Sequence, residues 1–184
     1  MKASSLVITE LITKKLLQFS AIVDRLQNKD PYFIPVLDDW MKEIESLFKD
    51  HNIAESAEIA GLRSKIIAPL FGEESRIAAK KKQLKIASEV LYDLQHAVLS
   101  VMKPHELKVN ESRDILNQLL GILKQTGAVK YQVGSDFQDF INKIWGVFST
   151  HEQLKASAIK ILTLISQADA VRIIAEEIEL NEWI

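Results

Sequence analysis

The chain of 184 residues contains no cysteine. Disulfides, thiolate metal sites, iron–sulfur clusters and a cysteine nucleophile are therefore excluded. Glycine and proline are also scarce, with 6 and 4 residues, which excludes collagen-like repeats and most linker-rich or turn-rich β designs. No apolar run approaches the roughly 20 uncharged residues that cross a bilayer. The early apolar run is interrupted by Glu10 and Lys14, so we expect no export signal and a cytoplasmic location.

The charge balance is close to neutral. Lys and Arg number 23 against 25 Asp and Glu, which gives a formal net charge of −2. Such a chain does not hold nucleic acid through its overall field. A globular chain of this length buries roughly 70% of the surface exposed by its unfolded form, so we expect it to fold without disulfides or a structural metal.

Hydrophobic residues recur at steps of three and four along almost the whole chain, and this spacing predicts amphipathic helices. Asp30-Pro31 and Lys103-Pro104 are expected to end helices, and Gly127 is expected to cap one. The expected helices cover about residues 5–29, 35–50, 52–68, 73–102, 105–126, 136–149, 151–165 and 167–180. Residues 128–133 alternate weakly and predict a short extended piece.

Four pairs of residues have the spacing of a capping box, in which a side chain at the start of a helix and another three positions later satisfy free backbone N–H groups. These pairs are Asn52 with Glu55, Ser135 with Gln138, Thr150 with Gln153, and Ser166 with Asp169.

These elements predict an all-α fold, a multi-helix bundle of about seven or eight helices around one long central helix. The C-terminal half is compatible with stacked helical pairs of the repeat kind. Short turns favour a single domain over residues 1–184. The alternative is an N-terminal bundle over residues 1–102 with a C-terminal helical subdomain over residues 110–184.

Three residues of the long helix resemble a metal-ligand stripe. Glu89, Asp93 and His96 are separated by steps of four and three, which bring side chains onto one helical face. Carboxylate-bridged metal sites need such a stripe inside a bundle, whereas this one points roughly opposite Leu91 and Leu94. We interpret it as a solvated polar face and expect no metal and no cofactor.

A basic cluster opens the same helix and contains Arg76, Lys80, Lys81, Lys82 and Lys85. On a helical wheel Arg76 and Lys80 fall within the apolar stripe, as Arg63 does in the preceding helix. Cations on an apolar face need carboxylate partners, solvent at the bundle end, or a bound anion. Convergence of these three residues in one pocket favours a phosphate or anion site, whereas separate carboxylate partners favour an interaction module.

Large aromatic residues suggest a candidate interface. Trp145 lies at the edge of an aromatic stripe whose main use is core packing, and it could anchor a partner. The chain ends in Trp183-Ile184. Two terminal apolar residues would expose considerable surface if left free, so we expect them to dock on the protein's own bundle, with a partner or second subunit as the alternative.

Common catalytic signatures are missing from the sequence. There is no phosphate-binding glycine loop, no Gly-x-Ser-x-Gly and no His-Glu-x-x-His. The leading hypothesis is therefore a non-enzymatic helical module that binds another protein or itself. The alternatives are a protein or enzyme that binds an anion or phosphate through Arg63, Arg76 and Lys80, and, less favoured, a nucleic-acid factor that uses Lys80 to Lys85.

Overall fold

The computed structural model describes residues 4–184, and the fold is all-α as the sequence predicts. The described residues contain no strand. They form α1 (Ser5–Gln27), α2 (Phe33–Asp50), α3 (Ser56–Ile67), α4 (Arg76–Thr126), α5 (Phe137–Thr150), α6 (Lys155–Leu164) and α7 (Gln167–Glu177), with two 3₁₀ turns, η1 (Ala68–Phe71) and η2 (Leu180–Glu182). The chain divides into two compact units. Unit 1 comprises residues 4–7 and 105–184, and unit 2 comprises residues 8–104.

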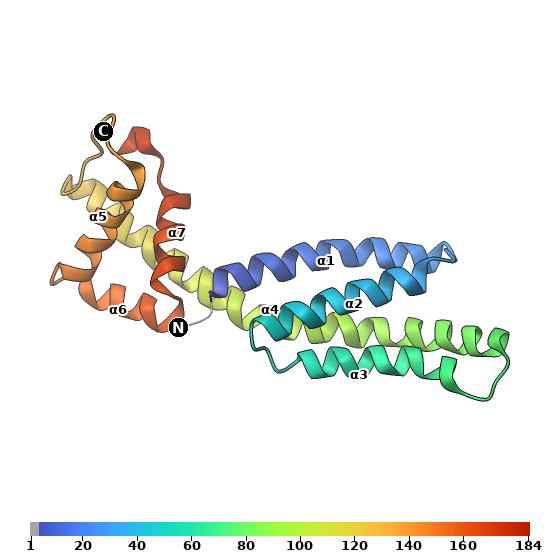
Figure 1. Cartoon of the computed structure of the whole chain (residues 1–184). Helices are drawn as coiled ribbons and strands as arrows, with labels where there is room; N and C mark the ends of the chain where they lie inside the picture. Colours follow the sequence, from blue (N-terminus) through green and yellow to red (C-terminus); the bar gives the residue numbers. More distant parts are fainter. Residues whose placement is uncertain (1–3) are drawn as a thin grey trace. The chain divides into compact units, whose positions relative to one another are not determined.

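Unit 2 is a bundle in which α1, α2, α3 and the first part of α4 run up and down in turn (Figure 1). Its core consists of aliphatic and aromatic side chains from all four helices. Between α1 and α2, the rings of Phe19 and Trp40 lie 5.0 Å apart, and Trp40 Nε1 donates a hydrogen bond of 3.0 Å to the Lys15 carbonyl. The buried indole thus keeps a partner for its polar end, as a buried tryptophan requires.

Unit 1 consists mainly of the second part of α4 together with α5, α6 and α7. Side chains from these four segments contribute to a separate hydrophobic core. Phe140 lies at its aromatic centre, with ring centroids 5.2 Å from Tyr131 and 5.8 Å from Trp183, both in edge-on geometry. The backbone N–H of Tyr131 also donates to the Trp183 carbonyl over 2.7 Å. The chain's last residues are therefore part of this unit's packing.

Pro104 does not end a helix, so the expected stop at Lys103-Pro104 is wrong. Instead α4 is one uninterrupted helix of 51 residues, and Pro104 lies in its interior. An internal proline costs about 3 kcal/mol through one lost hydrogen bond and a ring clash. Val101 is buried in the core of unit 2, and Val109 is buried in the core of unit 1. We attribute the helix's continuity to this packing on both sides. Residues 4–184 therefore contain seven α-helices, where eight were expected.

Only one of the four expected capping boxes forms. Ser166 and Asp169 cap α7 reciprocally, whereas α5 is capped by Asp136 instead of Ser135. Asn52 adopts a left-handed φ of 56° and does not cap α3, and α6 begins after Leu154 without a side-chain cap. Gly127 ends α4 at a left-handed φ of 59°, as predicted. Residues 128–133 form no strand.

Candidate functional site

Arg63 is held by carboxylates of the neighbouring helix. Its Nε lies 2.7 Å from Asp38 Oδ1, and its Nη1 lies 3.6 Å from Glu45 Oε2. Asp38 also pairs with Lys42 at 2.7 Å. The Arg63 side chain is 29% exposed, so this network lies at the edge of the core with its charges compensated.

The pKa values of the network follow its contacts. Partial burial raises the pKa of Asp38, but the hydrogen bonds from Lys42 and Arg63 and the positive charges of both residues together lower it by more, so the net pKa is lowered. The Lys49 hydrogen bond is the main reason that the pKa of Glu45 is lowered. The hydrogen bond to Asp38 raises the pKa of Arg63. Arg63 therefore has the carboxylate partners that favour a structural role.

The start of α4 is exposed, contrary to the apolar stripe expected there. Ile77 is 72% exposed, and Arg76 and Lys80 are also exposed. The buried face of α4 begins at Ala79 and Gln83 and becomes continuous from Ala87 onward. Within the described residues, Arg76 makes no ion pair. The structure thus does not bring Arg76 and Arg63 into one pocket with Lys80.

Lys80 instead lines a groove at one end of unit 2, which we call the tip groove. It has a volume of about 460 Å³ and lies where the α1–α2 turn meets η1 and the start of α4. Seven of its lining residues are apolar and four are polar. The lining residues are Leu26, Lys29, Asp30, Pro31, Phe33, Ile34, Pro35, Leu70, Lys80, Gln83 and Leu84.

The turn that forms one wall of the tip groove is fixed by local bonds. Lys29 adopts a left-handed φ of 55°. Asp30 Oδ1 accepts a 2.8 Å hydrogen bond from the Tyr32 N–H, and Arg25 pairs with the same carboxylate. The Tyr32 hydrogen bond is the main reason that the pKa of Asp30 is lowered. The wall is therefore preorganised, and its carboxylate is already occupied.

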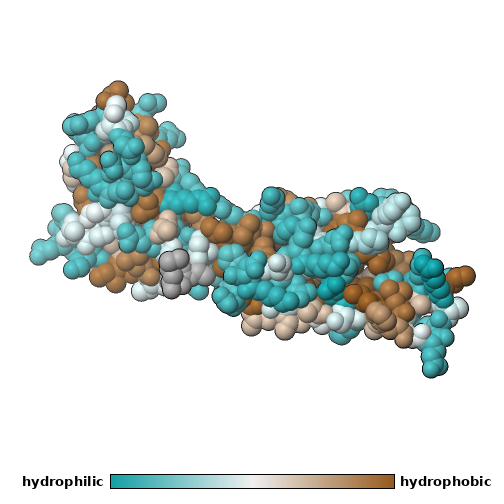
Figure 2. Space-filling view, in the orientation of Figure 1, coloured by the Kyte–Doolittle hydropathy of each residue, from teal (hydrophilic) through white to brown (hydrophobic). Residues whose placement is uncertain are grey.

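Large apolar side chains are exposed around the tip groove. Leu70 and Leu84 line it and are 46% and 45% exposed. Tyr32 and Phe71 adjoin lining residues in the sequence and are 68% and 84% exposed, and Ile77, three residues before Lys80 on α4, is 72% exposed. Figure 2 shows hydrophobic side chains gathered at this end of unit 2. Concentrated apolar exposure of this kind marks binding surfaces, whereas scattered single residues need no explanation.

The stripe of Glu89, Asp93 and His96 lies on the surface of α4. Glu89 pairs with Lys85 at 3.9 Å. Asp93 and His96 line a shallow hollow with Glu58 and Lys65 of α3, and the His96 ring stacks on Tyr92. No group of three or more His, Asp and Glu residues between positions 4 and 184 is placed to hold a metal ion.

The three residues proposed for an interface differ in exposure. Trp145 and Trp183 are 6% and 5% exposed and belong to the core of unit 1. The expectation that Trp183 docks on the protein's own helices is confirmed. The same expectation is wrong for Ile184, which is 66% exposed because the packing of the chain end stops at the Trp183 ring.

Sequence reasoning identified only one residue of the tip groove, Lys80. The other lining residues come from three stretches, 26–35, 70 and 83–84, that no local spacing connects. Two sequence features could have pointed to the groove. Pro31 and Pro35 lie at a helix junction, and the apolar pair Leu70-Phe71 stands just before a charged turn.

Comparison of the chain with protein-family models, with curated proteins and with solved structures gives no match. Among residues 4–184, no helix has the length and apolar character that a bilayer crossing requires.

Proposed function

We propose that the protein is a non-enzymatic, cytoplasmic helical module, and that the tip groove of unit 2 binds another protein. The observation that carries this proposal is the groove itself. Its lining is mostly apolar and is preorganised by the Asp30 turn, and exposed large apolar side chains surround it. Binding there removes from water the apolar surface that the isolated chain exposes.

The competing anion-site hypothesis has less support. It required Arg63, Arg76 and Lys80 to converge, whereas Arg63 is held by Asp38 and Glu45. The tip groove includes Lys80 but neither arginine. An apolar groove with few polar groups suits the burial of side chains better than it suits a free phosphate.

Site-specific photo-cross-linking tests this function. A photoreactive amino acid is placed in the full chain at Leu70 or Leu84, and the protein is exposed to an extract of its own cells. Both residues line the groove. We expect the same protein to be cross-linked from both positions.

The matched control carries the photoreactive group at Tyr92, which is 74% exposed on α4 and does not line the groove. Cross-linking of the same protein from Tyr92, or the absence of any adduct from both groove positions, contradicts the proposal.

A further inference from the structure

The backbone around the tip groove offers little to an extended peptide. The N–H groups of Tyr32 and Phe33 already donate to the Asp30 side chain and carbonyl. Pro31 and Pro35 carry no N–H. An extended peptide in the groove would therefore find few hydrogen-bond partners for its own backbone N–H and C=O groups. An α-helix satisfies its backbone internally, so the groove favours a helical occupant.

The lining side chains suit one face of such a helix. Leu26, Ile34 and Leu84 come from α1, α2 and α4 and meet at a single groove. An amphipathic helix presents apolar anchors at i, i+3, i+4 and i+7, which is the usual way in which helices fill a groove between other helices.

The charge around the tip groove is positive. Lys29 and Lys80 line it, and Arg76 and Lys81 adjoin Lys80 on α4. No ion pair involves any of these four cations within residues 4–184. Asp30 is paired with Arg25, and Glu74 is paired with Lys82. Two further carboxylates near this end, Asp24 and Glu73, have no ion pair within residues 4–184. This end thus carries excess positive charge in a chain whose net charge is −2.

The chain's own acidic C-terminal segment is already engaged elsewhere. Glu176 and Glu177 pair with Arg113, and Glu182 pairs with Lys124 at 2.6 Å. These three carboxylates are therefore not free to pair with the cations of the tip groove.

We propose that the tip groove selects an acidic amphipathic α-helix of a partner protein, with apolar residues on the inserted face and Asp or Glu at its margins. This inference rests on the proposed function and adds the chemistry of the partner. Carboxylates beside Lys29 and Lys80 complement the local charge, and such complementarity contributes to specificity and to the association rate.

The test uses three designed helical peptides of about 18 residues, or about five turns, with the same leucine face and with Glu, Gln or Lys at the flanking positions. Binding of each labelled peptide to the full chain is measured by fluorescence anisotropy. We expect the Glu peptide to bind about tenfold more tightly than the Gln peptide, and the Lys peptide to bind most weakly. The preference for Glu should shrink as salt is added, because screening weakens exposed charge pairs.

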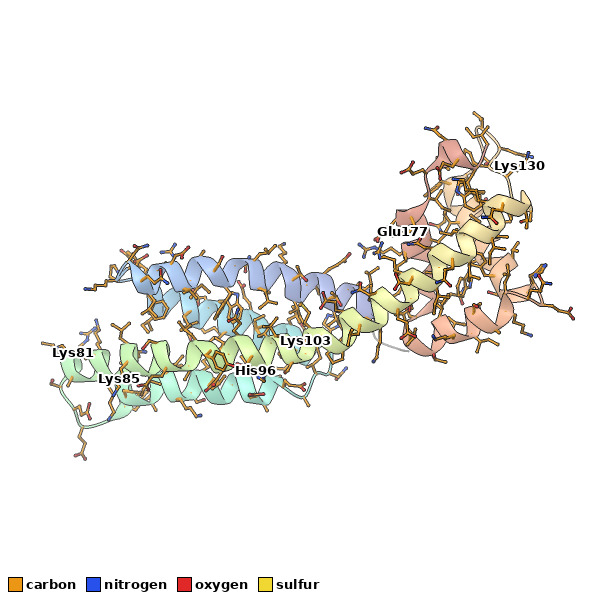
Figure 3. The ribbon with its side chains drawn as sticks, turned by 180° about the vertical axis from the view of Figure 1, so that it is seen from behind. Lys81, Lys85, His96, Lys103, Lys130 and Glu177 are labelled. Atoms are coloured by element: carbon orange, nitrogen blue, oxygen red, sulfur yellow. The ribbon has the colours of Figure 1, made fainter. Side chains whose placement is uncertain are left out.

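Charge-reversal variants locate the interaction. Lys80→Glu and Lys81→Glu should each weaken the Glu peptide about fivefold or more and have a smaller effect on the Gln peptide. Lys103→Glu is the matched control, because Lys103 is also an exposed lysine of α4 but lies away from the end that carries Lys81 (Figure 3). Leu84→Asp should abolish binding of both peptides, and circular dichroism verifies that each variant is folded.

The outcomes separate the inference from the proposed function. Equal binding of the Glu and Gln peptides, both lost in Leu84→Asp, overturns the acidic preference and leaves the protein-binding function intact. Failure of all peptides, with no cross-linking from Leu70 or Leu84, overturns both. Two other results would identify a different occupant and overturn the inference. One is that the chain sediments with anionic phospholipid vesicles but binds no peptide. The other is that the chain self-associates and Leu84→Asp abolishes this association.

Discussion

Arg63 illustrates what helical spacing reveals about a single residue. Its position in an apolar stripe correctly signals a cation that needs partners, and the structure supplies Asp38 and Glu45. Arg76 meets another of the expected alternatives, solvent at the end of the bundle, because that end of α4 is exposed. A helical wheel shows which side chains share a face but cannot show where the bundle stops covering that face.

The ion pairs of Arg63 predict a pH-dependent stability difference. Arg63→Met keeps an apolar stem and should lower the free energy of unfolding at pH 7 by about 1 kcal/mol, since the pair is partly exposed. Arg63 helps Lys42 to lower the pKa of Asp38, and it adds a smaller part to the lowering of the Glu45 pKa that Lys49 mainly causes. Their contribution is therefore present above the unfolded pKa values near 4 and is lost as pH falls through the lower folded values. Urea unfolding at several pH values measures this, and the difference from wild type should shrink in acid.

Lys82→Met is the control for that series. Lys82 pairs with Glu74 on an exposed surface, so its loss should change stability by less than about 0.5 kcal/mol. Equal effects of the Arg63 and Lys82 substitutions, or an Arg63 effect that does not depend on pH, would show that the network does not stabilise the fold.

Asp169 has a larger role than its sequence spacing predicts. It completes the capping box of α7 with Ser166. Its carboxylate also accepts from the Ser5 N–H at 3.1 Å and from the Ser4 hydroxyl. One side chain, only 3% exposed, therefore satisfies free donors at the starts of two helices that are far apart in sequence.

Asp169→Asn should lower the free energy of unfolding by about 1–3 kcal/mol, because an amide has one acceptor oxygen where the buried carboxylate has two. The matched control is Asp136→Asn, at the exposed cap of α5, where asparagine caps as well as aspartate and the expected change is near zero. Denaturant unfolding monitored by circular dichroism compares the two. Similar stabilities for both variants would mean that the Ser4 and Ser5 contacts contribute nothing.

Individual helices were predictable wherever the helical spacing of hydrophobic residues persisted over many residues and nearby side chains determined where the helix begins or ends. The Ser166 and Gly127 termini follow from side chains within a few residues. The continuity of α4 through Pro104 was not predictable, because it depends on Val101 and Val109 packing into cores built from distant segments. Local propensity lost to tertiary packing at that position.

Two glycines of α4 and its terminus should respond to alanine with opposite signs. Gly121 lies on the exposed face of the helix, and an added Cβ meets open space. Gly121→Ala should therefore stabilise the protein by about 0.5–1 kcal/mol by restricting the unfolded chain. Gly127 has a left-handed φ of 59°, where a side chain costs about 1–2 kcal/mol, so Gly127→Ala should destabilise. The midpoint of urea unfolding shows whether each variant is more or less stable than the wild type. A change in the same direction for both variants would contradict the helix end at Thr126.

At the scale of the whole molecule, the all-α class was predictable and the tip groove was not. The class follows from periodicity summed over the entire chain. The groove depends on Leu26, Leu70 and Leu84 meeting after three chain reversals. The sequence supplies the residues of such a site, but only the path of the chain brings them together.

The last prediction concerns how stability is divided along the chain. Units 1 and 2 have separate hydrophobic cores that share no residue. Ile144 is fully buried in the core of unit 1, and Ile44 is fully buried in that of unit 2. Replacing either by valine should cost about 0.5–1.5 kcal/mol and leave the chain folded. In native-state hydrogen exchange, backbone amides should then lose protection mainly in the unit that carries the substitution, since local opening depends on local packing. Each variant is the control for the other. An equal loss of protection across residues 8–104 and 105–184 in both variants would instead show that the chain opens as one cooperative domain.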